Sequence, residues 1–296
     1  MTSDLNKESI YKLTLINNNL ILKFNNEEVN VEVWQPIRSY IKNKISKEES
    51  KLLSSPIAAT HFDRTRISPI GGCNNHCAFC TLNNIKYTKN SIEDLDKCLQ
   101  VHLKDDRVTH VLITGGSPKE CDLKYLTEVY KFFCQKYQQY SFDVMMTPRG
   151  FDSYPDTSQY LEYLKLLKSF GVGGLSINLE LYDKKICEKY CREKFNIGRE
   201  NYFYFLKLAS KVFGTQNVRS GIIIGLESLQ SSLKGVEEIC KCGAMPVLSP
   251  YVPYNNIGTK PSTKFLENVL TKSEKIVKNY NLNLAPGCPY CHHNTL

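Results

Sequence analysis

The sequence lacks any long hydrophobic run, and this absence excludes a membrane-spanning helix of ordinary length. Its longest apolar stretches, 111–113 and 221–224, are far shorter than the ~20 residues that cross a bilayer. The amino terminus, MTSDLNKES, also lacks the hydrophobic core of a secretion signal. We therefore expect a cytoplasmic protein with no membrane partner.

The chain has no low-complexity tract and no internal repeat, which excludes collagen-like and repeat architectures. Its 296 residues are 42% hydrophobic, with a mean hydropathy of −0.34, which is the composition of a folded globular protein. That length suits one α/β barrel or two average domains. The net charge of +8 comes from scattered lysines, so we interpret it as a solvated surface and expect no nucleic-acid partner.

Cysteine, in contrast, is abundant for a protein expected to be cytoplasmic. The chain contains 12 cysteines, and thiols in that compartment stay reduced, so a scaffold of disulfide bonds is not the expected use of them. Binding of a metal ion or of an iron–sulfur cluster is the leading interpretation. The spacing of the cysteines is the evidence that distinguishes these two possibilities.

From Arg66 onward, short β-like runs alternate with amphipathic helical segments, the order that builds a parallel sheet with helical crossovers. The predicted strands are 66–70, 110–114, 142–146, 175–179, 219–224 and 246–249. The predicted helices are 91–104, 118–138, 157–170, 181–212 in two pieces, 228–241 and 262–280. Six such units are two short of a closed barrel, so the sequence predicts an α/β fold, a partial (β/α)6 TIM-like barrel with its active site at the carboxyl ends of the strands.

We expect three segments along the chain. Residues 1–65 form an N-terminal extension with a small β-meander (11–16, 20–24 and 29–34), a helix over 36–53 and a loop over 54–65. Residues 66–281 form the barrel core. Residues 282–296 are a cysteine-containing C-terminal tail, too irregular for a further βα unit.

Three cysteines, Cys73, Cys77 and Cys80, follow the first predicted strand at spacings of four and three residues. Such close, unequal spacing suits a 4Fe-4S cluster, because three thiolates bind three irons and leave the fourth iron open to a substrate or cofactor. One alternative is a zinc knuckle completed by His76, although His76 lies inside the loop, where ligation is strained. The other is three unconnected buried cysteines.

Cys73, Cys77, Phe79 and Cys80 resemble, residue by residue, the motif of the radical S-adenosylmethionine (SAM) superfamily, which follows the first strand of a partial barrel. The resemblance implies that the open iron binds SAM and that the cluster, at low potential, donates one electron to split the sulfonium. The products are methionine and a 5′-deoxyadenosyl radical, which abstracts hydrogen from the substrate. An electron donor such as flavodoxin or ferredoxin is implied as a partner.

A second match follows the second predicted strand, where the chain reads Gly115, Gly116, Ser117 and Pro118. Paired glycines let the backbone approach a ligand closely, and their carbonyls can accept hydrogen bonds from an ammonium group. The resemblance implies that this segment holds the SAM amino group, with Ser117 in place of the family's usual acid. The alternative is a plain strand-to-helix turn with Pro118 at the first helical position.

Further candidates lie on the fourth and fifth predicted strands. Asn178 and Glu180 share one side of a strand by its period of two. The resemblance implies Glu180 as a ribose contact and Arg192, or else Arg149, as the partner of the SAM carboxylate. It also implies that the strand around Ile223 packs against adenine. The alternatives are a helix-opening charge for Glu180 and an ordinary buried strand around Ile223.

The tail carries a Cys-x-x-Cys pair, Cys288 and Cys291, followed by two histidines. This is a metal-ligand spacing, and we interpret it as part of the binding site for a second iron–sulfur cluster. Two cysteines cannot complete such a site, so further ligands would come from Cys240 with Cys242, or from Cys187 with Cys191. The alternatives are a redox-active dithiol and a surface tail with incidental thiols.

The leading hypothesis is therefore an enzyme that acts on a small or carrier-bound substrate. Its compact size and second Cys pair resemble weakly the sulfur-inserting members related to biotin and lipoyl synthases. A second hypothesis is a radical rearrangement, epimerase or lyase reaction without sulfur transfer. A third is a non-catalytic module that binds an iron–sulfur cluster or zinc, and release of 5′-deoxyadenosine would distinguish the enzyme from it.

Overall fold

The computed structural model describes residues 11–17, 19–31, 35–148, 157–253 and 257–285. The chain forms two compact units, Met1–Asn43 and Lys44–Leu296. Segment 44–65, which the sequence assigns to the N-terminal extension, belongs by its contacts to the second unit. The barrel and the cysteine motif also lie in the second unit.

The first unit contains an antiparallel meander of β1 (Tyr11–Ile16), β2 (Asn19–Phe24) and β3 (Glu27–Val31), in that order across the sheet. A short helix, α1 (Ile37–Tyr40), follows. The single helix expected over 36–53 is instead three pieces, α1, the 3-10 turn η1 (Lys42–Lys44) and α2 (Lys47–Leu52). Ser46 begins α2 with a capping box in which its hydroxyl accepts the Glu49 N–H, so a new helix starts there.

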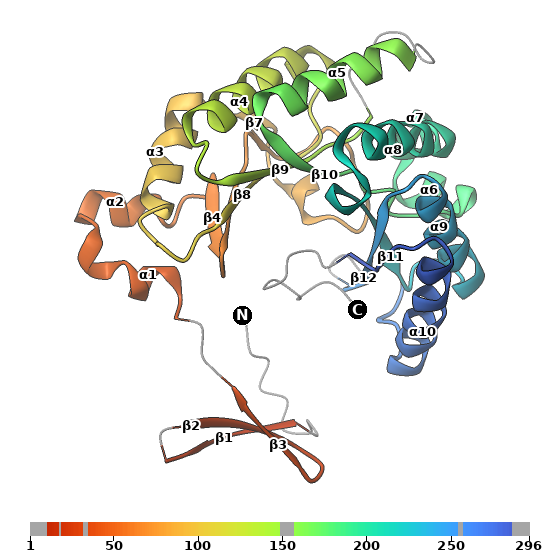
Figure 1. The fold of residues 1–296 in the computed structure, drawn as a ribbon, viewed down its shortest axis with the longest axis horizontal. Helices are drawn as coiled ribbons and strands as arrows, with labels where there is room; N and C mark the ends of the chain where they lie inside the picture. Colours follow the sequence, from red (N-terminus) through yellow and green to blue (C-terminus); the bar gives the residue numbers. More distant parts are fainter. Residues whose placement is uncertain (1–10, 18, 32–34, 149–156, 254–256, 286–296) are drawn as a thin grey trace. The chain divides into compact units, whose positions relative to one another are not determined.

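The second unit is built on a seven-stranded sheet in the order β12-β11-β10-β9-β8-β5-β4. Its strands are β4 (Ala58–His61), β5 (Arg64–Ile67), β8 (His110–Ile113), β9 (Ser141–Met145), β10 (Val172–Ser176), β11 (Val218–Ile224) and β12 (Met245–Pro250). Neighbours from β5 to β12 pair in parallel, and the sheet curls while the helices lie outside it (Figure 1). The predicted partial barrel is confirmed.

One strand of this sheet was not expected. β4 pairs antiparallel with β5 within the segment predicted as a loop, and the two join through a tight turn in which Phe62 has a φ of +56°. Two residues separate the strands, and His61 is the register partner of Arg64. An edge strand of four residues has too few alternating apolar residues to be recognised in the sequence. It forms because it pairs with β5.

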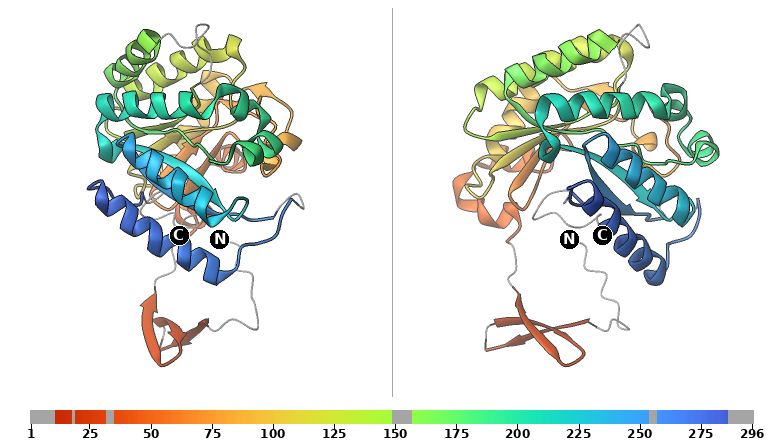
Figure 2. Two further views of the ribbon diagram at one scale, coloured as in Figure 1. Left: turned by 90° about the vertical axis from the view of Figure 1, so that its right-hand side faces the viewer. Right: turned by 45° about the vertical axis from the view of Figure 1, so that its right-hand side comes forward.

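In the described part of the chain, eight helices come after β5, and most of them lie on the convex side of the sheet (Figure 2). They are α3 (Ile92–His102), α4 (Leu123–Lys136), α5 (Thr157–Phe170), α6 (Lys184–Tyr190), α7 (Arg192–Ile197), α8 (Arg199–Phe213), α9 (Leu229–Lys241) and α10 (Thr263–Asn279). The stretch expected as two helical pieces is three, because Gly198 has a φ of +88° and separates α7 from α8. No helix in the described part of the chain is long and apolar enough to cross a bilayer.

The main apolar core fills the space between the sheet and these helices. Ile67, Val111, Phe142 and Val144 are almost fully buried there, on alternate residues of three adjacent strands. Their burial leaves the opposite, concave face of the sheet and the carboxyl ends of the strands for other residues. The functional candidates lie at those ends.

Candidate active site

A pocket opens at the carboxyl ends of the strands, and most of the predicted site residues line it. They come from the loop after β6 (Ile70–Gly71), the loop after β8 and the segment after β10. The predicted residues that line it are Cys73, Cys77, Phe79, Cys80, Gly115, Gly116, Ser117, Pro118, Asn178 and Glu180. Residues far apart in the sequence thus share one cavity, as the partial barrel requires.

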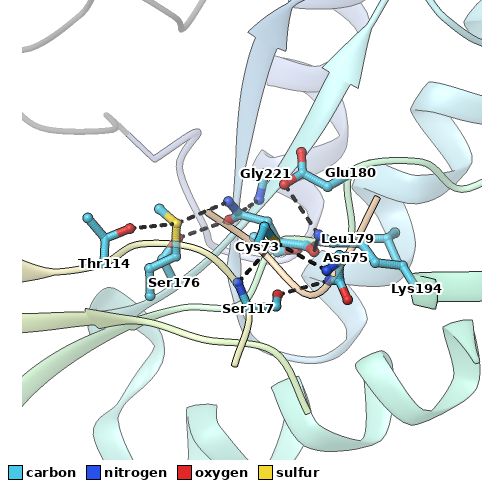
Figure 3. Close-up of polar contacts among 12 residues, drawn as sticks. Cys73, Asn75, Thr114, Ser117, Ser176, Leu179, Glu180, Lys194 and Gly221 are labelled. Carbon is cyan, nitrogen blue, oxygen red and sulfur yellow. Dashed lines mark hydrogen bonds and ion pairs between the residues drawn. The ribbon is translucent and has the colours of Figure 1, made fainter. Parts of the chain in front are cut away.

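The cysteine loop is closed at its base by a two-stranded pairing of β6 with β7 (Thr88–Lys89). Within it, the Cys73 sulfur accepts backbone N–H groups from Asn75, at 3.3 Å, and from Ser117, at 3.1 Å (Figure 3). The Asn75 side chain donates to the Ser117 hydroxyl at 2.9 Å. These contacts fix the Cys73 sulfur against the segment that follows β8.

The other two motif cysteines, Cys77 and Cys80, follow Cys73 further along the loop. The Cys80 N–H donates to the Cys77 carbonyl at 3.0 Å, and the neighbouring Ala78 N–H donates to the Tyr190 carbonyl at 2.8 Å. The Cys191 thiol beside Cys77 lowers the pKa of Cys77 below its usual range, against the effect of burial. Burial raises the pKa of Cys80. The loop is therefore anchored to α6 at the position of its middle cysteine.

The three motif cysteines fit a cluster better than a single ion. In the described part of the chain, no three Cys, His, Asp or Glu side chains converge on one ion position. Three thiols on the wall of one pocket, apart from one another, match ligands of three different irons of a cube. His76 does not complete a zinc site, because its side chain is largely exposed and pairs with Glu193 at 3.0 Å.

The Gly115–Ser117 segment packs directly against the cysteine loop. A Cβ atom at Gly116 would lie 1.7 Å from the Gly72 carbonyl oxygen and 2.6 Å from the Cys73 Cα. The Asn74 N–H donates to the Ser117 carbonyl at 3.0 Å. The residue that replaces the family's usual acid is thus held by the cysteine loop through its N–H, its carbonyl and its hydroxyl.

Asn178, Glu180 and Lys194 form a polar group that lines the same pocket, and Figure 3 shows the Glu180 and Lys194 side chains. The Lys194 ammonium donates to the Asn178 carbonyl at 2.8 Å and lies 3.3 Å from the Glu180 carboxylate. Lys194 is buried, which alone lowers its pKa, but Glu180 and the sulfurs of Cys77 and Cys191 raise the pKa above its ordinary range. Lys194 is therefore a fixed cation between the cysteine loop and Glu180.

Glu180 owes its position to an unusual backbone. It has a φ of +69°, a left-handed conformation that costs energy for a residue with a side chain. Its N–H donates to the Gly221 carbonyl, and its own carbonyl accepts the Ile223 N–H, each at 2.8 Å. These two bonds to β11 hold the strained residue, and they direct its side chain to Lys194.

Other predicted residues lie elsewhere. Arg192, at the start of α7, is exposed and does not line the pocket, where Lys194 stands instead. Ile223 is buried in an apolar cluster with Cys77 and Cys191 but does not line the pocket either. Arg149, Cys288 and Cys291 lie outside the described residues.

The cysteines considered as further cluster ligands divide into two places. Cys187 and Cys191, one helical turn apart, belong to the same apolar cluster as Cys77. Cys240 instead lies in the core under the helices, where burial raises its pKa to about 12. Only the first pair therefore lies beside the cysteine motif.

Thr114, Met145 and Lys194 are among the pocket residues that were not identified from the sequence. Thr114 and Met145 face each other across β8 and β9, where the Thr114 hydroxyl donates to the Met145 sulfur at 3.4 Å, and the amide of Asn178 lies 3.9 Å from that sulfur. Lys194 follows Arg192 by two residues, and the sequence alone favoured Arg192. Thr114 and Met145 could have been found in the sequence from their positions at the ends of adjacent predicted strands. Lys194 could not, because only the path of α7 decides which basic residue points into the pocket.

Glu227 positions the helices that carry Cys191 and Lys194. Its carboxylate accepts the N–H groups of Tyr182, at 3.0 Å, and Asp183, at 2.9 Å, at the start of α6. Glu227 is nearly fully buried, and burial raises its pKa to about 7 despite these hydrogen bonds. The segment after β11 is thereby tied to the segment after β10.

This buried carboxyl predicts a loss of stability as pH rises. Because the folded pKa is above the unfolded value, the native state keeps a proton that the unfolded chain loses. The free energy of unfolding should therefore fall between about pH 4.5 and pH 7, by up to about 3 kcal/mol from this group. Glu227→Gln removes the titration but keeps a carbonyl acceptor, so the pH dependence should become flatter.

Urea unfolding of anaerobically prepared protein across this pH range measures the effect. Glu274→Gln, an exposed residue on α10, is the matched control and should keep the wild-type slope. A Glu227→Gln variant with the same pH slope as wild type would contradict this account of Glu227.

Comparison with known proteins supports the fold. HydG, the FeFe-hydrogenase maturase from Carboxydothermus hydrogenoformans, is 17% identical with a TM-score of 0.53, covering 73% of this chain and 52% of that one, so the chain spans about half of HydG. A radical SAM methyltransferase from Sphaerobacter thermophilus is 11% identical with a TM-score of 0.56, covering 94% and 76%. SuiB from Streptococcus suis, solved with bound S-adenosylmethionine, is 14% identical with a TM-score of 0.57, covering 95% and 73%.

No curated protein sequence shows a significant match to the chain. A sequence profile of the radical SAM superfamily, however, matches residues 67–231, more than half of the 296 residues. The matched region runs from the end of β5 into α9 and includes the cysteine loop, the Gly115–Ser117 segment and the Glu180–Lys194 pair. The chain belongs to the radical SAM superfamily.

Proposed function

We propose that this protein cleaves SAM reductively at the pocket and uses the resulting 5′-deoxyadenosyl radical to abstract hydrogen from a small or carrier-bound substrate. The observation that carries the proposal is the arrangement of the pocket. Three cysteine thiols, a close-packed glycine pair and the Asn178–Glu180–Lys194 group surround one cavity at the carboxyl ends of the strands. The resident cofactors are then a 4Fe-4S cluster and SAM.

Cys73, Cys77 and Cys80 would hold the cluster through their sulfurs. A bound cluster supplies the electron that splits the SAM sulfonium. The protein's contribution is to hold the sulfurs: two backbone N–H groups donate to the Cys73 sulfur, and the Cys191 thiol, together with the Lys194 ammonium, lowers the pKa of Cys77. The buried apolar surroundings of Cys77 keep water away from its sulfur.

The polar group of Asn178, Glu180 and Lys194 suits the remaining groups of SAM. The Glu180 carboxylate can accept hydrogen bonds from the ribose hydroxyls, and Lys194, in place of Arg192, supplies a cation for the SAM carboxylate. Gly115 and Gly116 also line the pocket, and a backbone carbonyl of this pair can accept hydrogen bonds from the SAM ammonium group. The ribose hydroxyls, the carboxylate and the ammonium group of SAM then each have a candidate partner.

The direct test is anaerobic reconstitution with iron and sulfide, followed by dithionite and SAM. We expect formation of 5′-deoxyadenosine and methionine, detected by mass spectrometry, and then turnover with a flavodoxin or ferredoxin as electron donor. A fully loaded cluster that yields no 5′-deoxyadenosine under strong reductant would refute the proposal and favour a non-catalytic iron–sulfur module.

Glu180→Gln should weaken SAM binding by about tenfold, because a hydrogen-bonded charge contributes 1.5–3 kcal/mol in such sites and its loss leaves Lys194 unbalanced. The electron paramagnetic resonance spectrum of the reduced cluster should stay unchanged without SAM, since Glu180 is not a ligand. SAM titrations of that spectrum measure the affinity. Glu188→Gln, exposed on α6, is the matched control, and equal SAM affinity in both variants would contradict the assigned role of Glu180.

A second cluster at Cys288 and Cys291 would extend this function toward sulfur insertion of the biotin and lipoyl synthase type. The nearest described residue, Ala285, packs against Met245 and Val247 on the inner side of β12. The Cys-x-x-Cys spacing of the tail supports a second cluster, and the rearrangement, epimerase and lyase reactions are the alternative.

Iron and sulfide counts should decide between these reactions. With two clusters we expect about eight irons per chain, falling to about four in a Cys288→Ala, Cys291→Ala double variant that still cleaves SAM. Loss of sulfide during turnover would indicate sulfur insertion. About four irons in the wild type and no change in the double variant would exclude the tail cluster, and Cys121→Ala, an exposed cysteine outside the pocket, is the control.

A further inference from the structure

A row of three residues with a charged residue at each end crosses the concave face of the sheet. Ile67, Val111 and Phe142 pack into the core under the helices, so the alternate residues Arg66, Leu112 and Asp143 face the other way. Arg66 is the register partner of Leu112, and Leu112 is the partner of Asp143, so the three lie in one row across β5, β8 and β9.

This row lies directly below the cofactor pocket. Thr114 and Met145 line the pocket and follow Leu112 and Asp143 by two residues each. Two residues along a strand span about 7 Å, so the row is one layer of side chains nearer the amino ends of the strands. On β11, Arg219 faces the same layer, because its Nη2 lies 2.8 Å from the Asp143 Oδ2.

The charges of this layer do not balance. Asp143 pairs with Arg219, and Asp63, the other nearby carboxylate, contacts His110 at 3.6 Å and the Thr109 hydroxyl at 2.9 Å.

Arg66, in contrast, is exposed on the concave face and makes no side-chain ion pair with any described residue. The Nε of Arg64, one layer further down the same strand, is buried and has no hydrogen-bond partner in the described part of the chain. Two guanidinium groups on the concave side of the sheet thus make no ion pair with a described carboxylate, and a buried Arg64 Nε without a partner is costly.

From this geometry we infer that the substrate carries an oxyanion, a carboxylate or a phosphate, that binds to Arg66 with support from Arg64. The inference rests on the proposed function for the location of the reacting carbon. A planar guanidinium binds either oxyanion through two parallel hydrogen bonds, which fixes orientation as well as position. The substrate then extends about 7 Å, one layer of the sheet, from its anionic group to the carbon that faces the pocket.

Chemical modification of arginine tests this without any SAM turnover. The anaerobically reconstituted holoenzyme is treated with phenylglyoxal in the absence of SAM, and the rate at each arginine is measured by peptide mass spectrometry. Sodium phosphate, sodium succinate and the neutral analogue succinamide are the probes, with sodium chloride at matched ionic strength as the reference. Arg192, exposed on α7 and outside the pocket, is the internal control.

We expect phosphate or succinate to slow modification of Arg66 by about fivefold, while succinamide has no effect and Arg192 reacts equally in all conditions. Protection by phosphate alone would identify a phosphate ester as the substrate class, and protection by succinate alone would identify a carboxylate. Three results would overturn the inference: no protection beyond that given by chloride, equal slowing of Arg192, or Arg66 already unreactive before any anion is added.

A binding measurement gives a second test. Calorimetric titration with the protecting anion should show at least about a tenfold loss of affinity in Arg66→Gln and partial retention in Arg66→Lys, because a lysine keeps the charge without the paired donors. Lys124→Gln removes a charge from the exposed side of α4 and should bind as wild type does. Unchanged affinity in Arg66→Gln would overturn the inference even if SAM cleavage is established. Failure of SAM cleavage alone would instead refute the proposed function.

Discussion

Replacing Cys73, Cys77 or Cys80 singly by alanine should abolish both the cluster and the cleavage of SAM. A 4Fe-4S cube held by three thiolates has no spare protein ligand, so loss of one leaves two irons without protein support. We expect the iron content at the motif to fall from about four per chain to background, and 5′-deoxyadenosine formation to fall with it. Iron analysis, the absorption spectrum and the SAM cleavage assay measure the three effects.

Two controls make this result specific. Cys121→Ala changes an exposed cysteine outside the pocket and should keep both iron and activity. Cys191 requires separate attention, because its thiol lies beside Cys77 and could replace it as a ligand. If Cys77→Ala retains iron, the Cys77→Ala, Cys191→Ala double variant should lose it. Retention of iron in all three single variants would show that the motif is not the cluster site.

Gly116→Ala should be nearly as damaging, although it removes no ligand. The added Cβ would lie 1.7 Å from the Gly72 carbonyl oxygen, and both that oxygen and the Cys73 Cα are backbone atoms that cannot turn aside. The cysteine loop must therefore shift by an ångström or more. We expect a loss of about 3 kcal/mol in stability from overpacking and at least a hundredfold loss of SAM cleavage, since small displacements of reacting groups have effects of about that size.

The matched control is Gly173→Ala in β10, where the nearest atom to an added Cβ is the Phe142 carbonyl oxygen at 3.4 Å, an ordinary contact. That variant should retain its iron and most of its activity. Thermal unfolding followed by the cleavage assay separates the two effects of Gly116→Ala. Wild-type activity in Gly116→Ala would mean that the glycine pair does not pack against the cysteine loop as described.

Features that depend on neighbouring residues were predicted correctly from the sequence, whereas features that depend on distant residues were not. The six parallel strands and the helices between them were predictable because each contains its own apolar period. The edge strand β4 was not, because its four residues are held by pairing with β5. The division of 181–212 into three helices depends on two residues with a non-helical backbone: Cys191, with a φ of −148°, ends α6, and Gly198, with a φ of +88°, ends α7.

The site shows the same division between local and long-range information. Cys73, Cys77 and Cys80 were identified from spacing alone, because one loop supplies all three thiols. Lys194 and Arg192 differ by two residues on a short helix, and only the path of that helix against β10 brings Lys194 to Glu180 and leaves Arg192 exposed. A two-residue step on a helix changes direction by about 200°, so spacing on the chain cannot rank such neighbours.

The sequence by itself therefore determined the class of fold, the cysteine motif and, through them, the superfamily, because periodicity and spacing are properties of contiguous residues. The tertiary structure alone decided which distant side chains share the pocket. It placed the backbone of Gly116 against Gly72, the ammonium of Lys194 beside Glu180, and Arg66 in one row with Asp143. These relations arise from the curl and register of the parallel sheet, which are set by packing between elements that lie far apart in the chain.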